Sequence, residues 1–87
     1  MRYTKGDDWV ELEGCAGLPM RKLDALYTGN SGAAFEIARG VVQDWHMVVE
    51  GAEVQAGDCL GLTLRQWDWL RERIFENARA EALDPEV

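Results

Sequence analysis

Apolar residues recur every three or four positions near the C-terminal end of the chain, a spacing that places them on one face of a helix. The expected buried stripe of this helix is Leu64, Trp67, Leu70, Ile74 and Ala78. Thr63 stands just before the stripe and Gln66 follows three residues later, which is the capping-box pattern of a helix start. Because Pro85 disfavours helical backbone at Asp84, the pattern predicts a helix that runs to about Leu83.

Two shorter helices are predicted upstream of this one. The first begins after Pro19, since proline fits the first turn of a helix, and ends near Gly29. The second is capped by Asn30 or Ser31 and carries apolar residues at spacings of three and four. Its stripe consists of Ala34, Phe35, Ala38, Val41, Val42 and Trp45, with Val48 or Val49 beyond them.

The end of the second helix is open to two interpretations. The apolar stripe reaches Val49, so a single helix can include all of it. The neighbouring β-branched valines favour strands instead. In that case the helix would end near Trp45 and a hairpin would follow it. The strands of that hairpin would be residues 46–50 and 52–55, with the turn at Gly51.

Residues 8–13 mix β-forming and charged side chains near the N-terminus. Val10 and Leu12 share one face of the pattern, while Trp9 lies on the other. This arrangement predicts a short edge strand that ends at Gly14 and leaves an indole on its polar face.

The length of the chain allows one small domain, residues 1–87, in which residues 1–7 and 84–87 are expected to be frayed. The predicted fold class is α+β and mostly helical. It contains about three helices, a short edge strand and, in one of the two alternatives, a small hairpin.

The chain is acidic, with 16 Asp and Glu residues against 9 Lys and Arg residues and a formal net charge of −7. Direct binding to nucleic acid is not expected, because the phosphates would be repelled. The excess is concentrated in residues 31–62, where Arg39 is the one base among five acids: Glu36, Asp44, Glu50, Glu53 and Asp58. We interpret this region as a solvated acidic face. The alternative is a surface that meets a basic partner.

No apolar stretch approaches the roughly 20 residues needed to cross a bilayer, so no membrane association is expected. The first residues also lack the apolar segment of a signal peptide. These features favour a cytoplasmic location, where Cys15 and Cys59 would stay reduced and act as small buried hydrophobes.

The residues that carry chemistry are few and poorly spaced. His46, Cys15 and Cys59 supply three potential zinc ligands without the spacing of a zinc motif. Neither cysteine is flanked in sequence by bases that would lower its pKa. Ser31, the one serine, does not stand in a nucleophile elbow. The sequence therefore predicts a protein without enzymatic activity, catalytic residues, metal or cofactor.

Trp69 and Phe75 border the stripe of the last helix instead of occupying its centre. They widen its apolar face beyond what a domain of this size needs. Two interpretations are equally open: the helix is covered on two sides by its own domain, or Trp69 and Phe75 form a partner surface or a seam for self-association.

Several short motifs between residues 8 and 83 suggest a family. They are Asp8-Trp9-Val10-Glu11-Leu12, Val41-Val42-Gln43-Asp44-Trp45-His46-Met47, Glu50-Gly51-Ala52-Glu53-Val54, and Leu62-Thr63 followed by Trp67, Leu70 and Ile74. In this order the chain resembles the small tail assembly chaperones of tailed bacteriophages. The resemblance implies a non-catalytic protein in the host cell cytoplasm that binds an aggregation-prone tail protein and keeps it soluble.

Physical reasoning adds candidate contacts to this hypothesis. Met and Trp side chains adapt to irregular apolar partners, so we expect contacts from Trp9, Met20, Met47 and Trp69.

Two other functions remain open. Glu50, Glu53 and Asp58 would serve an acidic, anti-CRISPR-like inhibitor that docks on the nucleic-acid channel of a basic host defence nuclease. A homo-oligomer assembled through Trp69 and Phe75 is the third alternative.

Overall fold

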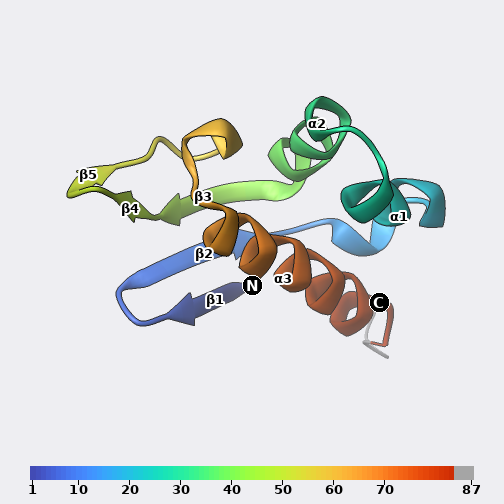
Figure 1. The fold of residues 1–87 in the computed structure, drawn as a ribbon. Helices are drawn as coiled ribbons and strands as arrows, with labels where there is room; N and C mark the ends of the chain where they lie inside the picture. Colours follow the sequence, from blue (N-terminus) through green and yellow to red (C-terminus); the bar gives the residue numbers. More distant parts are fainter. Residues whose placement is uncertain (84–87) are drawn as a thin grey trace.

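The computed structural model describes residues 1–83 and shows helices packed on a small antiparallel sheet (Figure 1). Its elements in order are β1 (Arg2–Lys5), β2 (Asp8–Leu12), the 3-10 turn η1 (Cys15–Gly17), α1 (Met20–Thr28), α2 (Ser31–Val41), β3 (Val42–His46), β4 (Val48–Val49), β5 (Ala52–Glu53), the 3-10 turn η2 (Cys59–Gly61) and α3 (Leu64–Ala82). The α+β class with a majority of helix is confirmed. The predicted fraying of residues 84–87 lies outside the described residues.

The three-stranded sheet has the order β1-β2-β3, and both pairs of strands are antiparallel. The predicted edge strand, residues 8–13, is therefore wrong in its position, because β2 lies at the centre of the sheet. The predicted fraying of residues 1–7 is also wrong, since residues 2–5 form the edge strand β1. The N-terminal amine holds this end in place by donating a hydrogen bond to the carbonyl of Leu12 at 2.7 Å.

Helix α2 ends at Val41, and the next residue already has extended backbone. The single helix through Val49 is therefore wrong, and so is an end near Trp45, which lies inside β3. The hairpin is confirmed as β4 paired with β5, with shorter strands than predicted. Its turn consists of Glu50 at φ 52° and Gly51 at φ 81°, and two consecutive positive φ angles define a type I′ turn.

The start of α3 is as predicted. The Thr63 side chain accepts a hydrogen bond from the Gln66 backbone N–H, and the Gln66 side chain accepts one from the Thr63 N–H. These bonds satisfy two amide donors that the helix start leaves without intrahelical partners. Asn30, one of the two predicted caps, accepts a hydrogen bond from the Ala33 N–H at the start of α2.

The core lies between one face of the sheet and the helices, and α3 crosses in front of the strands (Figure 1). Strand β2 contributes Val10 and Leu12 to it, and α3 contributes Leu70 and Ile74, all fully buried. Leu64 is an exception to the predicted stripe, because its side chain is 73% exposed. Helix α3 also packs against η1 and α1, and an apolar hollow of the surface forms between them.

Candidate functional site

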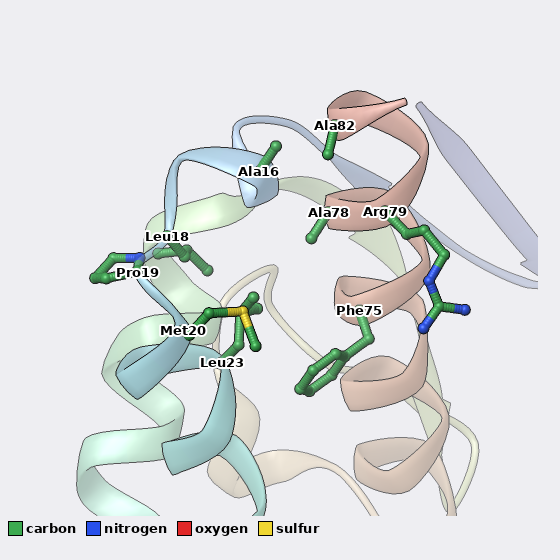
Figure 2. A pocket seen from close by; sticks show the side chains of 9 residues that line it. All are labelled: Ala16, Leu18, Pro19, Met20, Leu23, Phe75, Ala78, Arg79 and Ala82. Atoms are coloured by element: carbon green, nitrogen blue, oxygen red, sulfur yellow. The ribbon is translucent and has the colours of Figure 1, made fainter. Parts of the chain in front are cut away.

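An apolar groove of about 540 Å³ separates the segment η1–α1 from the C-terminal half of α3 (Figure 2). We call it the α1–α3 groove. It is lined by Ala16, Leu18, Pro19, Met20, Leu23, Phe75, Ala78, Arg79 and Ala82. Eight of these nine residues are apolar, and Arg79 is the one charged residue among them. Ligand-binding hollows in proteins are commonly of this size and composition.

The shape of the groove follows from the size of its side chains. Ala78 and Ala82 lie one turn apart on α3, and their short side chains leave the space between the walls open. Ala16 does the same on η1. Phe75 points from α3 into the space between the two walls (Figure 2). Met20 stands at the opposite wall and is 72% exposed, so a flexible thioether and an aromatic ring are both available to a bound apolar group.

A carboxylate joins the two walls at one end of the groove. Glu81 accepts hydrogen bonds from the backbone N–H of Gly14 at 3.1 Å and of Ala16 at 2.9 Å. Gly14 adopts a left-handed backbone at φ 82°, and η1 follows directly after it. The bond from Ala16 is the main reason that the pKa of Glu81 lies below its ordinary value. The charged carboxylate therefore ties the end of α3 to η1.

This tie predicts a pH effect. A depressed pKa in the folded state means that the Glu81 carboxylate stabilises the fold fully above about pH 4.5, and that this contribution is lost as the pH falls further. Glu81→Gln should therefore flatten the decline in unfolding free energy between about pH 5 and pH 3, measured by urea denaturation at several pH values. Glu13→Gln is the control, because Glu13 is exposed and makes no side-chain hydrogen bond within residues 1–83. An equal flattening in both variants would contradict the prediction.

A second, smaller groove of about 280 Å³ lies between η2 and the start of α3. We call it the η2–α3 groove. Phe35 and Trp67 meet edge to face within it, with ring centroids 4.9 Å apart. Leu60 and Leu64 stand on its rim and are 82% and 73% exposed. Two leucines this exposed beside an aromatic pair make this surface a candidate interaction site.

The three predicted aromatic contacts lie at different places on the protein. Phe75 lines the α1–α3 groove. Trp69 is half-buried beside a small hollow that Lys5 and Arg65 also line. Trp9 lies on the outer face of the sheet, with the Arg2 guanidinium 3.9 Å from its ring centroid. The structure therefore brings none of these three aromatic residues together in one site.

Met47 is a wrong prediction. Its side chain is 0% exposed and belongs to the core, so it does not reach the surface of the folded protein. Its carbonyl accepts a hydrogen bond from the Val54 N–H at 2.8 Å, which holds the return strand of the hairpin against it.

The predicted acidic contacts form part of a separate surface. Glu50 and Glu53 are both exposed on the β4–β5 hairpin, and Glu53 lies 3.6 Å from the His46 ring nitrogen. Asp58 is exposed at the start of η2. None of the three lines either apolar groove.

Sequence reasoning missed two residues that line the η2–α3 groove, Leu60 and Leu64, and one that packs beside the α1–α3 groove, Tyr27. Tyr27 was assigned only to a helix, yet its exposed ring packs on Phe75 at 5.4 Å. Leu60 was given no role, and Leu64 was expected in the buried stripe of the last helix. The sequence does contain one indication of this surface. Leu60 precedes Gly61 outside any predicted helix or strand, so no regular element places its side chain in the core.

The cysteine thiols are buried and are not in the reactive thiolate form. Burial raises the pKa of Cys15 to about 12 and that of Cys59 to about 11, so each thiol is protonated near neutral pH. Within residues 1–83, no three His, Cys, Asp or Glu side chains are grouped so as to hold a metal ion.

The same part of the chain contains no helix with the length and apolar character to cross a bilayer. No family model matches the chain, and comparisons with curated proteins and with solved structures also found no match.

Proposed function

We propose that this chain is a non-catalytic protein-binding module that holds an apolar segment of another protein in the α1–α3 groove. The observation that carries the proposal is the groove itself: about 540 Å³ of open, apolar space that no described residue fills. Exposed Met20 on one wall and Phe75 on the other offer the adaptable contacts that apolar partners need.

The partner that the sequence resemblance implies is a tail protein that needs protection before assembly. An aggregation-prone protein exposes apolar segments, and covering such a segment keeps it soluble. A shallow groove with small alanine walls accommodates segments of varied sequence better than a closed pocket. These features support a chaperone role of the tail assembly kind.

The test uses a synthetic 18-residue amphipathic helical peptide with leucines on one face and glutamines on the other. Its affinity is measured by fluorescence anisotropy. Met20→Asp places a charge on the groove wall and should weaken binding by about tenfold or more, because burying one such apolar side chain contributes roughly 1.5–3 kcal/mol. Met20 is largely exposed, so the fold should survive the change. Val48→Asp, an exposed position on β4, is the matched control. Equal affinity of the wild type and Met20→Asp would overturn the proposal.

A second candidate is the acidic inhibitor of a host nuclease, and the hairpin tip favours it. Glu50 adopts φ 52°, a conformation that costs a residue other than glycine about 1–2 kcal/mol. Strain of this kind often occurs at functional sites. An inhibitor acting through Glu50 and Glu53 should bind a polylysine peptide strongly at low salt and weakly at high salt. That binding should be lost with Glu50→Gln and Glu53→Gln and kept with Met20→Asp.

A further inference from the structure

We infer that the segment held by this module is an amphipathic helix that lies along α3 over both apolar grooves and places a carboxylate against Arg79. This inference rests on the proposed function and specifies the chemistry of its partner. Its basis is the position of both grooves along α3 and the sign of the charges that line them.

The two grooves are joined by a bridge of stacked side chains. Arg71 lines the η2–α3 groove, and its guanidinium lies 4.4 Å from the ring centroid of Tyr27. The Tyr27 ring in turn packs at 5.4 Å on Phe75, which lines the α1–α3 groove. The two apolar grooves therefore both follow α3 between Leu64 and Ala82, with the stacked side chains of Arg71 and Tyr27 between them. We call this surface the α3 stripe.

The length of this stripe fits a helix. The 19 residues from Leu64 to Ala82 span about 27 Å, because they are separated by 18 steps of 1.5 Å each. A partner helix of about 18 residues has the same length and presents apolar side chains at every third or fourth position. It would meet two exposed apolar anchors, Met20 on the wall of the α1–α3 groove and the Leu60–Leu64 pair on the rim of the η2–α3 groove. Helices commonly bind other proteins in such grooves.

The charges that line the stripe have one sign. Within residues 1–83 the charged residues that line the two grooves are Arg79 and Arg71, although the chain has 16 acids against 9 bases. Arg71 is already engaged, because it pairs with Asp68 and donates a hydrogen bond to the carbonyl of Leu26.

Arg79 makes no ion pair within the described residues. Glu76, three residues before it on α3, lies 3.5 Å from Arg73 instead. The guanidinium of Arg79 points away from Met20 and Phe75 (Figure 2). It is therefore placed to meet a carboxylate on the flank of a bound helix, outside the apolar contact.

A second copy of the chain fits this stripe poorly. Each copy carries a formal net charge of −7, and association would bring the two acidic proteins together. A partner with apolar anchors and carboxylates along one flank instead matches the arginine at the rim of the groove. Glu81, which joins the two walls at one end of the groove, has its charge compensated by hydrogen bonds from the Gly14 and Ala16 amides. At about 0.15 M salt the screening length is near 8 Å, so acids farther away act only weakly on that flank.

Three 18-residue peptides test the inference. They share one leucine face and carry glutamate, glutamine or lysine along the flank, and their affinities are measured by fluorescence anisotropy at 0.15 M salt. Wild-type protein should bind the glutamate peptide several-fold more tightly than the lysine peptide. Arg79→Glu should reverse that order. Arg65→Glu is the matched control, because it changes the net charge equally on a residue that lines neither groove.

The outcomes separate the inference from the proposed function. Equal changes in Arg79→Glu and Arg65→Glu, or tightest binding of the lysine peptide by the wild type, would overturn the inference. If all three peptides bind equally and Met20→Asp abolishes binding, the proposed function stands and the preference for a carboxylate is refuted. Concentration-dependent dimers of the chain alone that disappear with Met20→Asp would show that a second copy occupies the stripe and would also refute it.

Discussion

Trp45→Ala should reduce the free energy of unfolding by about 3–5 kcal/mol, which is a large fraction of the stability of a domain this small. Trp45 is buried in β3 and packs in the core opposite Val10 of β2. Its indole N–H also donates a hydrogen bond to the carbonyl of Val54 at 2.8 Å. The substitution therefore removes both a large apolar contact and the bond that ties the β4–β5 region to the sheet.

Urea denaturation followed by circular dichroism measures this loss. Trp9→Ala is the matched control, because Trp9 lies on the outer sheet face, where an exposed cation–π contact contributes about 0.5–1 kcal/mol. Trp45→Phe separates the two contributions: it keeps most of the ring and leaves the Val54 carbonyl without its donor, at a cost of about 1–3 kcal/mol. Similar losses for Trp9→Ala and Trp45→Ala would contradict this assignment.

The parts of the fold that could be predicted depend on neighbours in the sequence. Thr63 and Gln66 cap α3 through side chains three residues apart, and this signal is complete within the sequence. Leu70 and Ile74 are buried because their spacing places them on one face of the helix. The alternation of Val10 and Leu12 likewise identified the inner face of β2.

The parts that could not be predicted depend on residues far apart in the chain. Strand β1 has only Tyr3 as an inward-facing aromatic residue, so no alternation marks it, and its pairing with β2 supplies the order. The end of α2 at Val41 also depends on pairing with a distant segment. Val41 and Val42 fit a helix stripe as well as a strand, and the pairing of β3 with β2 decides between them.

The candidate site shows this limit more strongly. Phe75 was predicted as a contact from its place on α3, but the opposite wall of the groove, with Ala16 and Met20, lies more than 50 positions earlier. Only the packing of η1 and α1 against α3 brings these walls together. Met47, which spacing alone left free for a partner, is likewise buried in a core built from distant parts of the chain.

Asn77→Asp should destabilise the fold by about 3–5 kcal/mol near neutral pH, because it places an unpaired charge in the core. Asn77 is 1% exposed on α3 and is the one buried polar side chain within residues 1–83. Its amide nitrogen donates a long hydrogen bond, 3.4 Å, to the Tyr3 hydroxyl. Its amide oxygen has no hydrogen-bond partner among the described residues. Within residues 1–83 the one hydrogen-bond partner of this side chain is the Tyr3 hydroxyl, which is too little to compensate a carboxylate for its lost hydration.

The pH dependence of the Asn77→Asp variant distinguishes a buried charge from a simple packing defect. Burial raises the pKa of a carboxyl in the folded state above the unfolded value of about 3.9, so the unfolded state loses its proton first as the pH rises. The loss of stability should therefore be small at about pH 4 and grow toward pH 7. Asn77→Leu has the same branching and number of side-chain heavy atoms, and it should stay within about 1 kcal/mol of the wild type because it removes a buried oxygen that has no partner. Urea denaturation of both variants at pH 4 and pH 7 measures these differences, and an Asn77→Asp loss that does not change with pH would show that the side chain reaches water.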